Sequence, residues 1–431
     1  MSAPIGAVYE FNQPGEAIEI FRGTISGLAP GDVTGSVKLC WTPGPTIEWS
    51  VDPGTPPFFV NRNDEISMTL HRADGDVPFK GFARGIEGGW SNGATFGSDQ
   101  APLNRIVAHW FNLPNWHGQQ VLEDTPPEGG KRSWRGRSVI IAGDWTVTTD
   151  VRPDHSSVWD ELHLRDVYVM THVMEIRRTD GTGFTAADAE PLLTALHVGV
   201  SFALGRWAAP MLPVGQDSSG TTLWEDWRPA LCDAARRPSP GWWYEQDHDV
   251  LSDFLKLVVV AFSDPDIRIR LRMQMGFAIV ATGDKGFVEQ RITAGFSGLE
   301  HLMWQNLVLG GTLTRDQYRV AQAANSLRSV LAAAQIPIQI DASLLPALDS
   351  LATEKNLVGP EALTWVRNRL MHPDDRTPDV YQRVGLLRDT WTCTRYYLTL
   401  LILHSVGFSG SLRDLRSLSG MASDTQPVPW V

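Results

Sequence analysis

Three residues near the C-terminal end of the chain have side chains of the types that can cleave RNA. Arg367 and Asn368 are adjacent, and His372 follows four residues after the asparagine. A histidine exchanges protons near neutral pH, an arginine is a permanently charged phosphate ligand, and an asparagine amide can orient a neighbouring side chain. These types suffice for phosphodiester cleavage without a metal ion, so we predict that Arg367 and His372 are catalytic and that Asn368 supports them.

The segment that carries these residues is patterned as an amphipathic helix. At about 100° per residue, one face is apolar and the other carries the polar cluster. The apolar face holds Ala362, Leu363, Val366 and Leu370, and the other face holds Thr364, Arg367, Asn368, Met371 and His372. Proline is tolerated in a first turn, as at Pro360, and Pro373 disfavours helical backbone at His372. We therefore predict a helix over residues 359–372 with His372 at its accessible end.

The full spacing is more specific than an arginine and a histidine alone. An arginine, four to six residues and then a histidine should arise by chance about twice in such a chain. Requiring the asparagine and its fixed distance from the histidine lowers that expectation to roughly one in fifty. The loose pattern recurs at Arg165 and His172, but residues 162–176 are patterned as a strand. Arg165 and His172 therefore need not share a site.

Composition indicates a globular protein with more than one core. The chain has 431 residues, of which 42% are hydrophobic, and it should contain two or three domains. Its cysteines, Cys40, Cys232 and Cys393, are far apart and odd in number, which argues against a disulfide framework and favours the cytoplasm. The sequence contains no signal peptide pattern, no span long enough for a membrane and no metal-ligand spacing. We expect a cytoplasmic protein without membrane partner, metal or other cofactor.

The net charge of −12 is unusual for a protein that binds RNA, because phosphate contacts supply much of the affinity for nucleic acid. Arginines are nevertheless frequent after residue 366, with aspartates among them. Two interpretations stay open, an ion-paired helix surface or a local RNA groove around His372 to which Arg369 and Arg376 contribute. The overall acidity argues against nonspecific binding of bulk nucleic acid.

The N-terminal residues 1–205 are patterned as a β-rich domain. Short β-branched and apolar runs alternate with turn residues, and a helix should follow from residue 185 or 186 to 202. Strands are expected near residues 17–22, 35–41, 65–70, 138–142 and 166–177. Residues 206–246 are rich in proline and tryptophan, which predicts an irregular connector. The first part should therefore be β-rich with an α+β finish.

Residues 247–408 are patterned as helices throughout. Apolar periodicity and glycine or proline breaks delimit the helices. They are expected at residues 248–262, 266–281, 287–309, 314–334, 359–372 and 379–406. Residues 409–431 should form a flexible tail. The expected fold class is α+β in two parts, with an all-α bundle in the second.

Arg367-Asn368-x3-His372 resembles the RNxxxH motif of HEPN ribonucleases, and the resemblance covers roughly residues 245–408. The helix around Glu300, residues 298–304, is similar to a helix of Apea-like HEPN domains. Residues 103–115 and 169–177 look similar to the ApeA N-terminal region that precedes such domains in bacterial antiphage proteins. The resemblance implies an all-α HEPN bundle, a homodimer and an endoribonuclease used in abortive infection, with Arg367 and His372 catalytic. The N-terminal domain would then sense a trigger such as a phage component.

Two further residues are candidates for support of the catalytic pair. Glu300 lies between leucines on an apolar helix, where an unpaired carboxylate is costly. We expect its helix to pack against that of Arg367, with Glu300 as a partner of the arginine, as a structural ion pair or at the surface. Thr364, one turn before Asn368, is the second candidate.

Alternatives of a different class stay open. Basic residues at a helix C-terminus also interact favourably with the helix dipole, which alone could account for Arg367 and His372. A HEPN fold could serve as a non-catalytic nucleotide-binding or dimerisation module, with the N-terminal domain recognising a ligand. His197, His301 and His404 lie in helical, mostly apolar runs and are expected to be core or interface residues.

Overall fold

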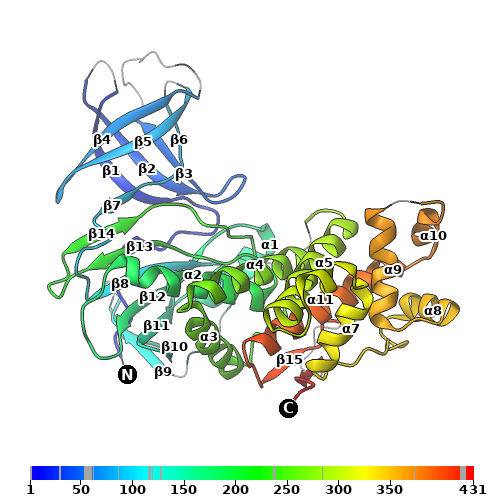
Figure 1. The fold of residues 1–431 in the computed structure, drawn as a ribbon. Coiled ribbons are helices and arrows are strands. Elements are labelled where there is room, and N and C mark those ends of the chain that lie inside the picture. Colours follow the sequence, from blue (N-terminus) through cyan, green and yellow to red (C-terminus); the bar gives the residue numbers. More distant parts are fainter. Residues whose placement is uncertain are drawn as a thin grey trace. The chain divides into compact units, whose positions relative to one another are not determined.

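The computed structural model describes residues 2–28, 31–52, 61, 63–85, 87–114, 118, 120–126, 129–235, 239–283, 285–372, 374–417 and 424–431. The chain forms two compact units, residues 1–197 with 208–237 and residues 198–207 with 238–431. The first is β-rich and the second is mainly helical, so the expectation of a two-part α+β chain is confirmed at that level (Figure 1). Asn115 and Pro373, which the sequence interpretation used, lie outside the described residues.

Strands β1 to β6 close into an antiparallel barrel in the order β1-β2-β3-β6-β5-β4 (Figure 1). They are β1 (Ile18–Ser26), β2 (Val33–Cys40), β3 (Thr46–Val51), β4 (Glu65–Arg72), β5 (Gly75–Gly85) and β6 (Gly88–Ser91). Side chains alternate between the two faces of a strand, and Ile66, Met68 and Leu70 of β4 are accordingly buried. The strands expected near residues 17–22, 35–41 and 65–70 are confirmed.

A second antiparallel sheet in the first unit has the order β7-β14-β13-β8-β12-β11-β10-β9. Its strands are β7 (Thr95–Gly97), β8 (Arg105–Phe111), β9 (Gln120–Asp124), β10 (Arg132–Ala142), β11 (Trp145–Val151), β12 (Met170–Arg178), β13 (Pro210–Gln216) and β14 (Thr222–Asp226). Helix α1 (His155–Arg165), which the sequence interpretation missed, precedes β12. Helix α2 (Ala186–Leu204) follows it and confirms the helix expected from residue 185 or 186.

The expected irregular connector over residues 206–246 is wrong for β13 and β14. Proline cannot donate a hydrogen bond to a sheet, so it is tolerated at strand starts and bulges. Pro210 begins β13, and Pro213 lies where the register against β8 shifts between Met211 and Val214. Two of the prolines that suggested a connector, Pro210 and Pro213, therefore occupy positions that a strand permits.

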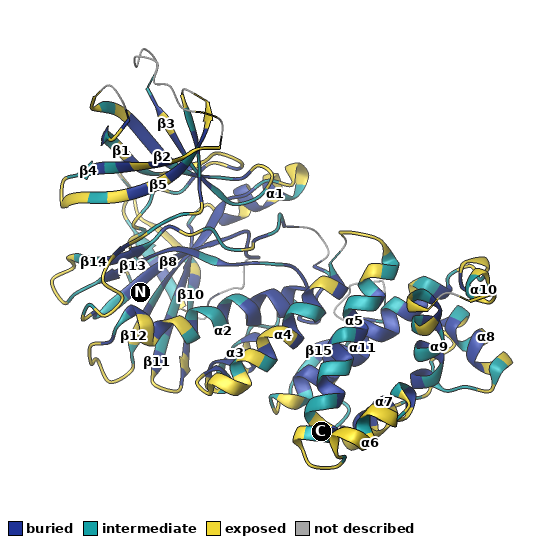
Figure 2. Cartoon of the chain, turned by 45° about the horizontal axis from the view of Figure 1, so that its top comes forward, coloured by how far each residue is buried: buried dark blue, intermediate teal, exposed yellow. Residues whose placement is uncertain are grey.

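The second unit is built from helices α3 to α11. They are α3 (His248–Phe262), α4 (Pro265–Thr282), α5 (Val288–Trp304), α6 (Arg315–Val320), α7 (Ala323–Ala333), α8 (Pro346–Lys355), α9 (Gly359–Met371), α10 (Thr377–Gln382) and α11 (Leu386–Ser405). Helix α11 is buried along most of its length and packs against α4, α5, α8 and α9. Figure 2 shows this central helix mostly in the colours of buried and intermediate residues, whereas α10 and α6 are largely exposed.

Several helix boundaries differ from the expected ones. The helix expected over 287–309 ends in a π-helical turn, Gln305–Leu309, and the one over 314–334 divides into α6 and α7 at extended backbone around Ala321. Gly385, with a φ of 85°, separates α10 from α11. None of the helices in the described part of the chain is both long and apolar enough to cross a membrane.

The flexible tail expected over residues 409–431 is wrong for the part that the structure describes. Strands β15 (Ser411–Arg413) and β16 (Thr425–Pro427) pair with each other. Leu412 and Val428 are buried, because apolar side chains at this end complete the core of the second unit. The indole of Trp430 also donates a hydrogen bond to the carbonyl of Phe408 at 2.8 Å.

Candidate functional site

Helix α9 positions the candidate catalytic residues as its apolar periodicity predicts. Ala362, Leu363 and Val366 have no exposed surface, which confirms the predicted core face. The carboxylate of Glu361 accepts a hydrogen bond from the backbone N–H of Val358 and so caps the first turn. The opposite face is thereby turned away from the core of the second unit.

The guanidinium of Arg367 is held by two neighbours. Its Nη2 donates to Oε1 of Glu300 at 2.7 Å, and its Nη1 donates to Oδ1 of Asn368 at 3.2 Å. The guanidinium carbon lies 5.8 Å from the centroid of the Phe296 ring. A guanidinium has five N–H donors, so the donors that these bonds leave over can receive a phosphate. With 22% of its side chain exposed, Arg367 is oriented and still reachable.

Glu300 reaches Arg367 from α5, and the packing of that helix explains its place. A Cβ atom at Gly298 would lie 2.9 Å from Leu398 of α11, and one at Gly295 would lie 2.7 Å from Thr394. Glycine at both positions therefore allows α5 and α11 to approach closely. Helices α5 and α9 also contact each other, as expected. Glu300 is paired with Arg367 and its side chain is 41% exposed, so the ion pair is observed, and its role as a partner in catalysis stays a prediction.

Asn368 links Arg367 to His372. Its side-chain oxygen accepts from Arg367, and its backbone carbonyl accepts from the backbone N–H of His372 at 2.7 Å. His372 follows the last residue of α9, with a φ of −131°, and its side chain is exposed. The predicted accessible position of the histidine is therefore confirmed.

The direction of α9 along α5 sets the order of the site. Arg367 contacts Glu300, whereas Met371, one turn later, accepts a hydrogen bond from Thr293 at 3.8 Å. The two helices are thus antiparallel where they touch. His372 lies beyond Arg367 in the direction of the N-terminal end of α5.

Two of the candidate residues, Thr364 and Arg369, form hydrogen bonds within α9 itself. The hydroxyl of Thr364 donates to the carbonyl of Pro360 at 2.8 Å, which is a local bond within α9. Arg369 is buried with its guanidinium carbon 3.5 Å from the centroid of the Trp365 ring, and it donates to the carbonyl of Trp365. Its burial does not fit the expected RNA contact, because a phosphate ligand must be reachable. Arg376 is exposed and fits that expectation.

The second arginine and histidine match does not form a comparable site. Arg165 ends α1 and pairs with Glu161 at the surface. His172 lies in β12 without exposed surface, and burial, together with the neighbouring His155, lowers its pKa well below the usual value. The strand-like patterning of residues 162–176 is confirmed from Met170 onward, in β12, and is wrong for residues 162–165, which form the end of helix α1.

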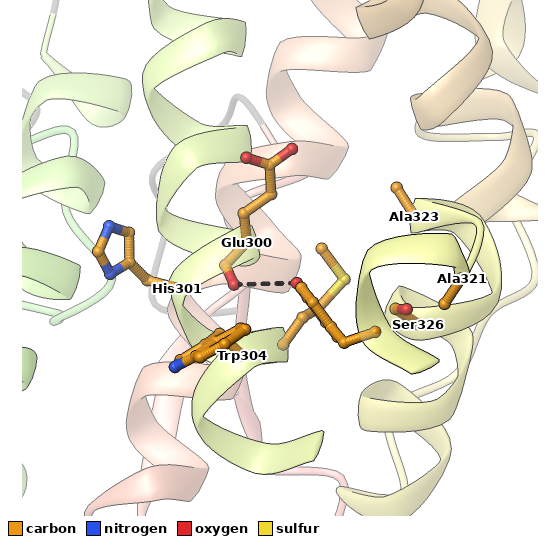
Figure 3. Close-up of a pocket in the computed structure, with 8 residues that line it drawn as sticks. Glu300, His301, Trp304, Ala321, Ala323 and Ser326 are labelled. Atoms are coloured by element: carbon orange, nitrogen blue, oxygen red, sulfur yellow. Dashed lines mark hydrogen bonds between the residues drawn. The ribbon is translucent and has the colours of Figure 1, made fainter. Parts of the chain in front are cut away.

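A cavity that the sequence interpretation missed adjoins Glu300 (Figure 3). It has a volume of about 400 Å³ and lies among α5, α6 and α7. Its lining residues are Glu300, His301, Met303, Trp304, Tyr318, Ala321, Ala323 and Ser326. The turn between α6 and α7 at Ala321 brings Tyr318 and Ser326 to the same cavity. No sequence signal predicts that turn, because neither glycine nor proline marks it.

The described residues offer no cluster of three or more His, Cys, Asp or Glu side chains that could hold a metal ion. Arg367 is bonded to the carboxylate of Glu300 and to the amide of Asn368, and His372 follows at the end of the same helix. Such a set can bind a phosphate and move a proton.

The chain is similar to two described domain families and to one uncharacterized protein, none of which has a stated activity. Residues 98–238 match a family model described as the YopA central domain, and residues 265–422 match one described as the YopA C-terminal domain. The chain is 23% identical over 440 residues to the SPbeta prophage-derived uncharacterized protein YopA of Bacillus subtilis (strain 168), covering 98% of this chain and 96% of that protein. No solved structure matches the chain. The second family match includes both α5 and α9, so Glu300 and the Arg367 motif lie within the region of similarity.

Proposed function

We propose that this protein is a metal-independent endoribonuclease of the HEPN type, with its active site at Arg367, Asn368 and His372. The observation that carries the proposal is the arrangement of these side chains. A partly exposed arginine is oriented by Glu300 and Asn368, and an exposed histidine follows on the same helix. The resemblance of the motif to RNxxxH adds the reaction class.

In the proposed reaction the ribose 2′-hydroxyl of the substrate is the nucleophile. His372 accepts the proton of this hydroxyl as its oxygen bonds to phosphorus, or it protonates the 5′-oxygen that leaves. Arg367 stabilises the negative charge that develops on the phosphorane oxygens. The O2′–P bond forms and the P–O5′ bond breaks, which leaves a 2′,3′-cyclic phosphate and a 5′-hydroxyl. The second proton transfer is assigned to water or to the histidine of a second copy.

A homodimer with a composite site is part of the proposal. Arg367 and His372 lie on the face of α9 that is turned away from the core, so a two-fold axis beside this face would bring two motifs together. One histidine could then act as base and the other as acid. A site within each chain is the simpler version.

The β-rich first unit is assigned the regulatory part of this function. We propose that it recognises a trigger, such as a phage component, and that the nuclease acts in abortive infection. The competing proposal is a non-catalytic nucleotide-binding or dimerisation module. The ion pair of Arg367 with Glu300 is compatible with it, since a paired arginine also suits static phosphate binding.

Incubation of the purified full chain with single-stranded RNA tests the proposal. Wild type should cleave and His372→Ala should not, while both bind RNA with similar affinity. As a matched control, His71→Ala removes a partly exposed histidine of the barrel and should cleave like wild type. Binding without cleavage by the wild-type chain, under all conditions that support binding, would favour the non-catalytic module.

A further inference from the structure

The cavity beside Glu300 has the size and lining of a site for one flat aromatic ligand. Its volume of about 400 Å³ is in the range of small-molecule sites. Trp304 and Tyr318 line it with their rings 5.3 Å apart and nearly perpendicular, at 84°. A ring that enters can therefore stack on one of them and meet the edge of the other.

A hydroxyl of the cavity suits the edge of such a ring. Ser326 is almost fully buried on α7, and a hydroxyl can both donate and accept hydrogen bonds. The ring of His301 points to the other side of α5, where its centroid lies 5.5 Å from that of Phe277 (Figure 3). A nucleobase presents a π-face and a hydrogen-bonding edge together, and single-stranded RNA is recognised through both.

Glu300 joins this cavity to the candidate active site. Its carboxylate binds Arg367, and its backbone carbonyl accepts from the hydroxyl of Tyr318 at 3.5 Å, the bond that is dashed in Figure 3. Burial, and then the Glu300 carboxylate, raise the pKa of Tyr318, so its hydroxyl keeps the proton that it donates. In Figure 3 the carboxylate of Glu300 points away from Trp304, so the two contacts use opposite ends of the residue.

The order along α5 places the cavity one nucleotide from the reacting phosphate. Trp304 follows Glu300 by one helical turn, a rise of about 6 Å. His372 lies in the opposite direction, beyond Arg367. A strand whose phosphate binds Arg367 can thus extend one nucleotide toward Trp304.

From these contacts we infer that the cavity binds one nucleobase of single-stranded RNA, adjacent to the phosphate held by Arg367. This inference rests on the proposed function for the position of the phosphate. The stack on Trp304 or Tyr318 supplies affinity, and Ser326 contacts the base edge.

Binding of an uncleavable RNA to the full wild-type chain tests the inference. The probe is a single-stranded RNA oligonucleotide with 2′-O-methyl sugars, in which one abasic position is moved along the strand. Removing the base that occupies the cavity should weaken binding about tenfold, the size of one base stack on an aromatic ring. The same abasic probe should lose no further affinity with Trp304→Ala, because that variant has already lost the stack.

Two more variants guard against a change in folding. Ala323→Leu fills the cavity and leaves both rings in place, so it should give the same loss as Trp304→Ala. Leu164→Ala removes an exposed apolar side chain of α1 in the first unit and should bind every probe like wild type. Melting curves of the variants should stay close to that of the wild type.

Cleavage measured in parallel separates this inference from the proposed function. Suppose that removal of one base weakens binding to the wild type but not to Trp304→Ala, while unmodified RNA is not cleaved. That result would support the base site and refute the nuclease. If RNA is cleaved but no abasic position shows a loss of binding that depends on Trp304, the base site is refuted and the nuclease is supported. A chain that binds none of the RNA probes overturns the base site as well.

Discussion

Glu300 and Arg367 lie 67 positions apart in the chain and form an ion pair of 2.7 Å between α5 and α9. The pair is partly exposed, so its contribution to stability is small, about 0–1 kcal/mol. Its effect is to orient the guanidinium, whose second contact is Asn368. An ion pair that contributes little to stability but fixes the orientation of one side chain is typical of a functional site.

Replacement of Arg367 or His372 by alanine should abolish RNA cleavage. Both side chains reach solvent, so the melting temperature should stay close to that of the wild type. Asn368→Ala should be partial, because the amide orients Arg367 and breaks no bond. The measurement is cleavage of a labelled RNA, with Arg272→Ala as a control at an exposed arginine of α4. Undiminished cleavage by either alanine variant would refute the assignment.

Replacement of Glu300 by alanine should lower cleavage by roughly tenfold, because the arginine loses its main orienting partner. The free energy of unfolding should change by no more than about 1 kcal/mol. Glu354→Gln, which removes a surface carboxylate paired with Arg383, is the control and should cleave normally. If Glu300→Ala and the control cleave at the same rate, the ion pair has no part in catalysis.

Cleavage should persist in EDTA and leave 2′,3′-cyclic phosphate and 5′-hydroxyl ends, because the nucleophile is supplied by the substrate. RNA with a 2′-deoxy or 2′-O-methyl sugar at the scissile position should resist cleavage, and so should DNA. End-group analysis of the products makes the decision. Products with 5′-phosphates, or a strict need for a divalent ion, would assign the nucleophile to activated water and end the proposed roles of Arg367 and His372.

Cleavage per chain should fall on dilution if two copies form a composite site, because dissociation separates the motifs. Light scattering and activity should be measured over the same concentration range. Mixing inactive Arg367→Ala with inactive His372→Ala should restore part of the activity in a composite dimer. A fully active monomer would refute the composite site and would be consistent with one active site in each chain.

Acid should destabilise the first unit through His109. Val8 donates to Nε2 of this residue, and Nδ1 lies 3.2 Å from the carbonyl of Leu212, so the neutral ring fits both partners. Burial lowers the pKa of His109 from 6.5 to about 4. The unfolded state binds this proton as the pH falls below 6.5, whereas the folded state resists until the pH approaches 4. Stability is therefore complete above 6.5 and is lost as the pH falls through this window.

Denaturant titrations at several pH values, followed by tryptophan fluorescence, measure this loss. The expected slope from one such histidine is about 1.4 kcal/mol per pH unit within the window. In His109→Gln the slope should fall by about that amount, and His71→Ala is the control at a partly exposed histidine. Identical pH profiles for the wild type and His109→Gln would show that His109 does not carry the effect.

The sequence alone determined the features that depend on local periodicity and on residue type. The expected bounds of 248–262 agree with α3, and the apolar face of α9 is the buried one. Strands whose residues alternate, such as β4, were placed within a few residues. The spacing of apolar residues within one segment is enough to show which face of that segment is buried.

Only the tertiary structure decided which distant segments meet. The strand over residues 210–216 carries two prolines that hid it, and the strand over residues 222–226 was missed beside it, because the place of both in the sheet depends on partners such as β8. The turn at Ala321, the cavity that it closes and the burial of Arg369 on Trp365 likewise have no local signal. The sequence predicted Glu300 as a candidate partner of Arg367, but the packing of α5 against α9 made the choice. Side-chain pairing between elements is set by the whole core, whereas helix and strand patterns are set within each element.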